Sequence, residues 1–207
     1  MKLIKKFFYS TICVFGLVFN SYADLEGASN FSKEFSEEIF NIVKQEKNVS
    51  QIREELILYV KENIDITWTS RFVLGKHWKT TTPVEKAQFT NLFEEYLILN
   101  YAPKFEGYNG ENYSIIDTKM LAPKKYVTKL ILTLSDKTEI LVEIYILEKN
   151  NTFKAVDIAG EGVSFAATQR AEFNSLITAN GFPKFLDMLE DKIANLKTPQ
   201  TTENASK

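Results

Sequence analysis

The spacing of apolar residues changes twice along the chain, and these changes constrain the fold more than any other feature of the sequence. From about residue 31 to residue 101, apolar residues recur every three or four positions, as on one face of an α-helix. From Tyr113 to Ala159 they alternate with polar residues, as in half-buried β-strands. Helical spacing returns after Gly162. Helices, then strands, then helices predict an α+β domain whose helices pack on the apolar face of a twisted antiparallel sheet of about four to five strands.

Several helix ends are also predicted. Ser29 or Asn30 is suited to cap the first helix, and Ser50 the second. A short apolar stretch over 68–74 stops at Gly75, a residue type that commonly ends helices.

The strongest local signal is Thr82-Pro83-Val84-Glu85. The Thr82 hydroxyl suits the N-cap, Pro83 suits the first helical position, and Glu85 stands where a capping box needs its carboxylate. A helix is therefore expected to begin here and to end near Tyr101, before Pro103. Two further helices are expected over 170–180 and 183–196.

Four strands are expected over 113–118, 126–134, 138–147 and 152–159, with hairpin connections at 135–137 and 148–151. In the third strand Glu139 and Glu143 alternate with Ile140, Val142 and further apolar residues. One face of the sheet is therefore expected to be apolar and the other largely solvated.

The N-terminal residues 1–23 have the pattern of a cleaved signal peptide. Lysines at positions 2, 5 and 6 precede an apolar run over 7–19, and small residues at Ser21 and Ala23 suit cleavage after Ala23. The alternative is a retained membrane anchor, but thirteen helical residues span about 20 Å, short of the roughly 30 Å of a bilayer core. Because Cys13 is the only cysteine, the mature chain has none, which favours the bacterial periplasm over a disulfide-bonded secreted domain.

The remainder is interpreted as a single domain over 24–196, followed by a polar tail over 197–207 that is expected to be disordered. The composition, with 44% hydrophobic and 25% charged residues, is that of a globular protein. A net charge of −2 gives the chain no overall positive field to attract nucleic acid.

Candidate catalytic and metal-binding groups are few. One histidine and one cysteine exclude a Cys/His zinc cluster, and no nucleophile motif accompanies His77. Asp157 and Glu161 near the end of the fourth strand are the best acid–base candidates, but a hydrogen-bonded structural role is the simpler interpretation. No enzymatic activity, metal or cofactor is therefore predicted. Composition alone leaves open whether the apolar residues form a solid core or surround a cavity.

Several stretches, read in order, resemble the MlaC or toluene-tolerance auxiliary family, the periplasmic phospholipid carriers of the Mla lipid-asymmetry system. They are Phe72-Val73-Leu74-Gly75-Lys76-His77-Trp78-Lys79 with Thr82-Pro83, then Lys154–Ile158 with Glu161-Gly162-Val163-Ser164, and finally Phe173 and Gly181. The resemblance covers about residues 25–196. The family often has Trp where Phe153 stands and an aromatic residue near Thr168.

The resemblance implies an NTF2-like α+β fold with an apolar cavity, a bound phospholipid as cargo, and no enzymatic activity. It also implies two partners, an inner-membrane ABC transporter complex and an outer-membrane lipoprotein–porin complex. The expected lipid-binding residues on the sheet are Leu130, Leu132, Leu134, Ile140, Val142, Ile144, Ile146, Val156 and Ile158. The expected lipid-binding residues on the helices are Phe72, Val73, Phe93 and Leu97.

Two other classes of function stay open at this point, an envelope hydrolase or isomerase on a similar scaffold and a non-catalytic adaptor module. Lys76, Lys79 and Arg170 are candidates to meet a phosphate or an acidic partner, with ordinary solvated charge as the alternative.

Overall fold

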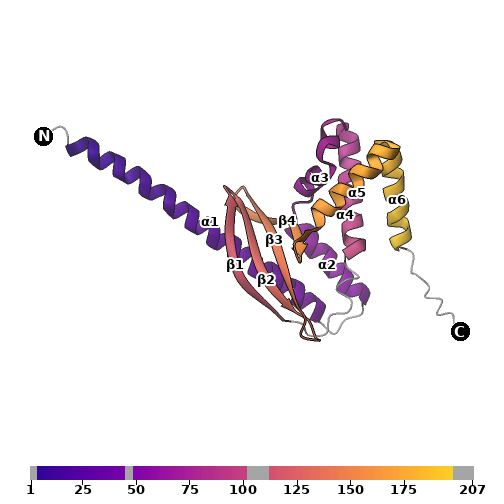
Figure 1. The fold of residues 1–207 in the computed structure, drawn as a ribbon, viewed down its shortest axis with the longest axis horizontal. Helices are drawn as coiled ribbons and strands as arrows, with labels where there is room; N and C mark the ends of the chain where they lie inside the picture. Colours follow the sequence, from indigo (N-terminus) through magenta and orange to yellow (C-terminus); the bar gives the residue numbers. More distant parts are fainter. Residues whose placement is uncertain (1–3, 45–48, 102–111, 198–207) are drawn as a thin grey trace. The chain divides into compact units, whose positions relative to one another are not determined.

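The computed structural model describes residues 4–44, 49–101 and 112–197 (Figure 1). Its helices are α1 (Ile4–Lys44), α2 (Val49–Asn63), α3 (Ile66–Leu74), the 3₁₀ helix η1 (Gly75–Lys79), α4 (Pro83–Tyr101), α5 (Phe165–Asn180) and α6 (Phe182–Lys197). Its strands are β1 (Asn112–Ala122), β2 (Lys125–Thr133), β3 (Glu139–Lys149), β4 (Thr152–Gly160) and β5 (Val163–Ser164), in the sheet order β1-β2-β3-β4-β5. The predicted α+β class with an antiparallel sheet is confirmed.

The chain forms two compact units, each made from two separate segments. Met1–Glu38 and Glu111–Gly162 form the first, here called the sheet unit. Ile39–Gly110 and Val163–Lys207 form the second, here called the helical unit. The predicted single domain over 24–196 stays a prediction.

Tight turns produce the meander of the sheet unit. Asn150 and Asn151 have φ of 52° and 60°, and they join Lys149 directly to its partner Thr152. Asparagine tolerates this left-handed conformation better than most residues, which explains a two-residue hairpin here. The predicted connection over 148–151 is too long, because Glu148 is still paired with Phe153 within the sheet.

Helix α1 packs on one face of the sheet through small side chains. Ala28 and Ser32 are both fully buried, and the Ser32 hydroxyl lies 2.7 Å from that of Thr128 on β2. A side chain at Gly27 would lie 2.6 Å from the ring of Phe153 on β4. The small residues therefore allow the helix backbone to approach the strands closely.

The predicted start of this helix at Ser29 or Asn30 is wrong, because both residues lie inside α1. Residues 20–28 contain no proline, and the close approach at Gly27 gives that glycine a packing role within the helix. The predicted cleavage after Ala23 also falls within α1 and stays a prediction. Within the described part of the chain, no helix combines the length and apolarity needed to span a membrane.

The opposite face of the sheet is less solvated than the alternation in β3 predicts. Lys129 and Glu143 form a cross-strand ion pair of 3.0 Å there, as expected for a polar face. Val127 and Ala159 share that face by register and are nevertheless buried. Both faces of the sheet therefore carry buried apolar residues.

Aromatic side chains form the core of the helical unit. Phe173 on α5 lies at its centre, with ring centroids 6.1 Å from Phe89, 6.0 Å from Phe93 and 5.0 Å from Phe185. Phe89 and Phe93 are fully buried on α4. The two-sided apolar pattern of α4 in the sequence is explained by this position between other helices.

Two helix ends in this unit follow the predicted chemistry, whereas the predicted cap Ser50 lies inside α2, which begins at Val49. The Thr82 backbone N–H donates to the Glu85 carboxylate (2.7 Å), and the Glu85 N–H donates to the Thr82 hydroxyl (3.2 Å), which confirms the capping box at the start of α4. Gly75 ends α3 with φ of 53°, also as predicted. The predicted disordered tail lies outside the described residues, apart from Lys197 at the end of α6.

Candidate functional site

The apolar face of the sheet brings most of the predicted lipid-binding residues together. The strand register pairs Leu130 with Val142, Leu132 with Ile140, and Ile144 with Ile158. Directly paired residues point to the same side of a sheet, and residues two apart on a strand do so as well. Ile146 shares this face through its pairing with Tyr126. Leu134 follows directly after β2, and the role of all these residues in lipid binding stays a prediction.

This face changes from buried to accessible along the strands. Leu130, Ile144 and Ile146 are all at most 4% exposed. Toward the other end of the same face, Leu132, Ile140 and Val142 are only half-buried. Ile158 beside Ile144 is 37% exposed. The sheet unit therefore presents a continuous aliphatic surface that is closed at one end and accessible at the other.

Val156 differs from the other predicted sheet residues. A register shift lies between Tyr145 and Ile146, so that Tyr145 pairs with Asp157 while Ile146 pairs with Ala155. Val156 is left between these pairs and is buried. Strict alternation would place Val156 and Ile158 on one face. Because of this irregularity in β4, the position of Val156 no longer follows from that of Ile158.

Buried polar groups hold the closed end of the face in place. Thr128 lies 2.9 Å from the Thr118 hydroxyl as well as 2.7 Å from that of Ser32, so three hydroxyls link α1, β2 and β1. Nearby, the Tyr126 hydroxyl donates to the Glu148 carboxylate at 3.1 Å, and Lys124 lies 3.6 Å from the same carboxylate.

Burial raises the pKa of Tyr126 to about 12, with the hydrogen bond to Glu148 as a further cause. The phenol is therefore neutral and acts as a donor at physiological pH. The sequence does not predict this pair, because Glu148 lies in a predicted turn. No local signal indicates that its side chain points inward.

The predicted helical lipid-binding residues have three different environments. Val73 and Phe93 are fully buried within the aromatic core of the helical unit. Phe72 is half-buried on α3, with its ring stacked on Trp68 (5.5 Å) and covered by the Arg170 guanidinium (5.0 Å).

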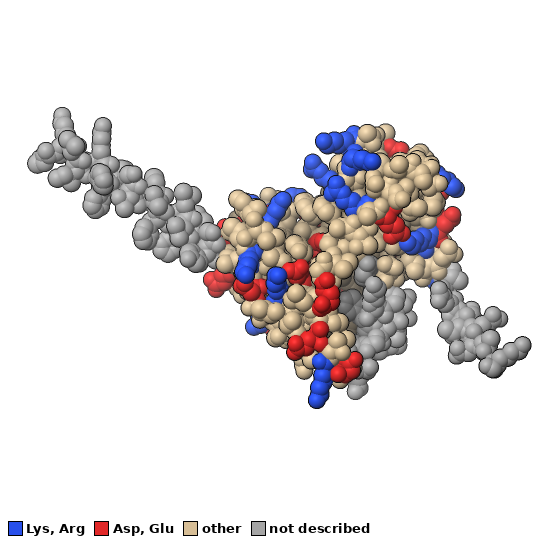
Figure 2. All heavy atoms as spheres, in the orientation of Figure 1, with Lys and Arg blue, Asp and Glu red and all other residues tan. Residues whose placement is uncertain are grey.

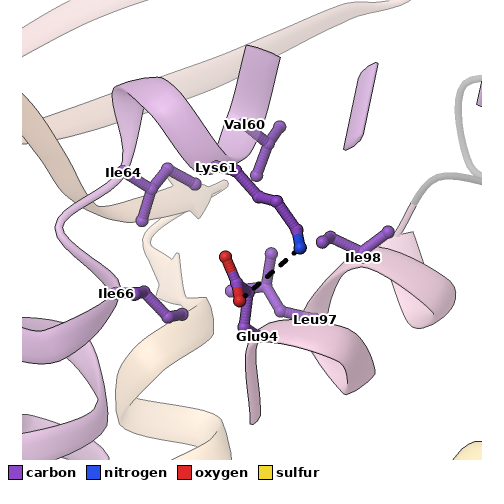
Figure 3. A pocket seen from close by; sticks show the side chains of 7 residues that line it. All are labelled: Val60, Lys61, Ile64, Ile66, Glu94, Leu97 and Ile98. Atoms are coloured by element: carbon purple, nitrogen blue, oxygen red, sulfur yellow. Dashed lines mark ion pairs between the residues drawn. The ribbon is translucent and has the colours of Figure 1, made fainter. Parts of the chain in front are cut away.

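Leu97 lines a small pocket in the helical unit (Figure 3). Apolar side chains from α2, α3 and α4 surround it, and Lys61 and Glu94 form an ion pair of 3.7 Å beside it. The space that it encloses is about 10 Å³, far below the roughly 300–1,000 Å³ of typical small-molecule sites. We therefore do not assign a lipid site to this pocket.

The acid–base candidates each have a structural hydrogen bond. His77 Nε2 lies 3.1 Å from Asn174 Oδ1. Asp157 Oδ1 accepts from the Ile158 N–H at 2.9 Å, and Glu161 accepts from the Leu141 N–H. Among the residues that the structure describes, no three His, Cys, Asp or Glu side chains are grouped so as to hold a metal ion.

Comparison with known proteins identifies the class to which this arrangement belongs. The fold matches the structure of the phospholipid-binding protein from Ralstonia solanacearum, determined in complex with a phospholipid. The TM-score is 0.75 at 17% sequence identity, and the match covers 83% of this chain and 99% of that one. The α+β architecture of the two proteins is therefore the same.

The family model of the MlaC protein matches residues 33–191. This protein belongs to the MlaC family, as the motifs around Gly75 and Gly162 predict.

Proposed function

We propose that this protein is a periplasmic phospholipid carrier, exported by its N-terminal signal peptide. In this proposal it exchanges lipid between an inner-membrane ABC transporter complex and an outer-membrane lipoprotein–porin complex, and so maintains outer-membrane lipid asymmetry. The observation that carries the proposal is membership of the MlaC family, together with a fold shared with a protein solved in complex with a phospholipid.

The physical need for such a carrier is large. Each exposed CH₂ costs about 0.8 kcal/mol, or roughly 25 kcal/mol for two acyl tails of about 16 carbons. Transfer from a bilayer into an apolar pocket avoids most of this cost, because the tails are dry in both places. A carrier therefore needs aliphatic surface and a means of opening it, and it needs no catalytic group.

The aliphatic face of the sheet unit supports this role. It offers side chains without polar atoms from β2, β3 and β4, and its accessible end includes Val142 and Ile158. In the proposal, acyl chains contact this accessible end, and the headgroup stays in solvent.

The first test is the lipid content of the purified protein. We expect native mass spectrometry of protein expressed in a bacterial host to show a bound phospholipid, which solvent extraction then identifies. A protein that is entirely free of lipid under gentle conditions would contradict the proposal.

The second test uses two adjacent residues of β3 that point to opposite faces. Val142 and Leu141 are both half-buried, but only Val142 lies on the predicted lipid-binding face. A charge introduced on that face must be desolvated against acyl chains, so Val142→Glu should remove most of the bound lipid. The control Leu141→Glu should keep it.

Circular dichroism spectra of both variants establish that they are folded. If both folded variants lose lipid equally, or neither does, the assignment of the lipid to this face is wrong.

A further inference from the structure

One segment of the helical unit carries basic residues without any acidic ones. Between Asp65 and Glu85 the chain contains Arg71, Lys76 and Lys79 and no aspartate or glutamate. The two flanking carboxylates are both used in helix capping. Asp65 accepts from the Trp68 N–H at the start of α3, and Glu85 closes the capping box of α4.

Arg170 on α5 lies next to this basic segment. A Cβ at Gly75 would lie 2.9 Å from its guanidinium, so the Arg170 side chain lies close against the backbone at the end of α3. The guanidinium lies 5.0 Å from the centre of the Phe72 ring, which in turn stacks on Trp68. The cation is therefore held by an aromatic surface in place of a carboxylate.

A second cation, Lys86 on α4, is held in the same way. Its ammonium lies 5.4 Å from the centre of the Trp78 ring on η1. The Thr81 hydroxyl donates a hydrogen bond to the backbone carbonyl oxygen of Trp78, which links the turn before α4 to η1. We call Arg71, Lys76, Lys79, Lys86 and Arg170 the basic patch.

The basic patch has no acidic partner among the described residues. The ion pairs of the described residues are all made by lysines outside the basic patch. None of the five cations of the patch lies within ion-pair distance of a described carboxylate. Four of the five side chains are exposed, and Lys86 is half-buried. Figure 2 shows basic side chains gathered at the end of the helical unit that Figure 1 labels α3. In a chain with a net charge of −2, this local excess of positive charge is a distinct feature.

An exposed apolar side chain accompanies the charges. Val84, in the first turn of α4, is 77% exposed, the highest value among the large hydrophobic side chains whose burial the structure describes. Two tryptophans lie in the same part of the unit, on α3 and η1. Cations together with tryptophan and an exposed aliphatic residue are the combination found at membrane–water interfaces.

We propose that the basic patch docks this protein on an anionic phospholipid bilayer. Lysine and arginine near such a surface are attracted to its headgroup phosphates, and Val84 enters the interfacial region. An acidic protein surface also attracts cations, but the combination of cations with two tryptophans and an exposed aliphatic residue favours a membrane interface. The inference rests on the proposed function for its biological role, since a lipid carrier has to approach the membranes that it serves.

The test is sedimentation of the purified full-length protein with lipid vesicles. Vesicles of phosphatidylcholine containing about 30% phosphatidylglycerol are compared with vesicles of phosphatidylcholine alone, at low and at physiological salt. We expect binding only to the anionic vesicles, weakening as salt screens the charges. Each lysine near an anionic surface contributes about a fivefold change in affinity, so K76E/K79E should bind at least about 25-fold more weakly.

The matched control is K119E/K184E, which changes the net charge equally. Lys119 and Lys184 are also exposed, but both lie outside the basic patch. This variant should bind like the wild type. The milder variant K76Q/K79Q, which should bind at least several-fold more weakly than the wild type, replaces K76E/K79E if circular dichroism shows that the latter is unfolded.

Three results would overturn the inference. They are no binding of the wild type to anionic vesicles at low salt, equal binding by the basic-patch variant, and binding to soluble polyglutamate without binding to vesicles. The last result would identify the patch as a docking surface for an acidic protein.

Native mass spectrometry of the same preparations separates this inference from the proposed function. The basic-patch variant should keep its co-purified phospholipid. If the wild type carries no lipid, the carrier proposal fails, whatever the result with vesicles.

Discussion

Replacement of Phe173 by alanine is expected to destabilise the protein by about 4 kcal/mol. Phe173 is 1% exposed, and its ring makes aromatic contacts with Phe89, Phe93, Tyr96 and Phe185 at centroid distances of 5.0–6.1 Å. Truncation of a buried phenylalanine to alanine costs about 3–5 kcal/mol, through lost burial and the cavity that remains. Oriented aromatic pairs contribute about 0.5–1.5 kcal/mol beyond their buried area, which places the expected value near the middle of that range and above its lower end.

Tryptophan fluorescence during urea unfolding measures this loss directly. Trp68 and Trp78 are the only tryptophans of the chain, and both lie in the helical unit. With a dependence of about 2 kcal/mol per M urea, the midpoint of Phe173→Ala should fall by about 2 M. The control Ser175→Ala changes an exposed residue of the same helix and should stay within about 0.5 kcal/mol of the wild type.

A leucine at position 173 should have an intermediate effect on stability. Phe173→Leu keeps part of the side-chain volume, so its midpoint should fall between those of the wild type and the alanine variant. A loss of less than about 1 kcal/mol for Phe173→Ala would show that this ring is not the centre of a close-packed core, and the argument would then be refuted.

Two further predictions concern pH. Hydrogen bonds from the backbone and side chain of Thr82 lower the pKa of Glu85, so their contribution is present above the ordinary carboxyl pKa and is lost as the pH falls through the lowered one. Thr82→Ala should therefore lower the melting temperature by about 3 °C at pH 7, and the difference should shrink below about pH 4; a constant difference would contradict this. Tyr126, with its pKa raised to about 12 by burial and by Glu148, contributes stability that is present below about pH 10 and is lost as the pH rises through 12. Melting curves from pH 9 to 12 should fall more steeply for the wild type than for Tyr126→Phe, and parallel curves would contradict the assignment.

Local chemistry explains what could be predicted from the sequence. The capping box at Thr82 and Glu85 depends on residues three apart, and the end of α3 depends on one glycine in a left-handed conformation. The strands also follow from short-range alternation. Their residue pattern further predicts that Leu130, Val142 and Ile144 share one face, which the register confirms.

Features that depend on contacts between distant segments could not be predicted. The irregularity beside Val156 arises from pairing with β3, and alternation within β4 gives no sign of it. The sequence predicts Glu148 in a turn, and its buried contact with Tyr126 follows only from the fold. Arg170 and Gly75 are neighbours only in the folded helical unit, so the basic patch is divided between two distant parts of the sequence.

The interleaving of the two units has a consequence for synthesis. Ser32 lies 96 residues before its buried partner Thr128. The helical unit likewise needs α5 and α6 from the end of the chain to be complete. A growing polypeptide leaving the ribosome therefore cannot complete either unit until most of the chain has emerged. Its aliphatic and aromatic segments remain uncovered during that interval, which makes it a natural client for chaperones that hold chains unfolded.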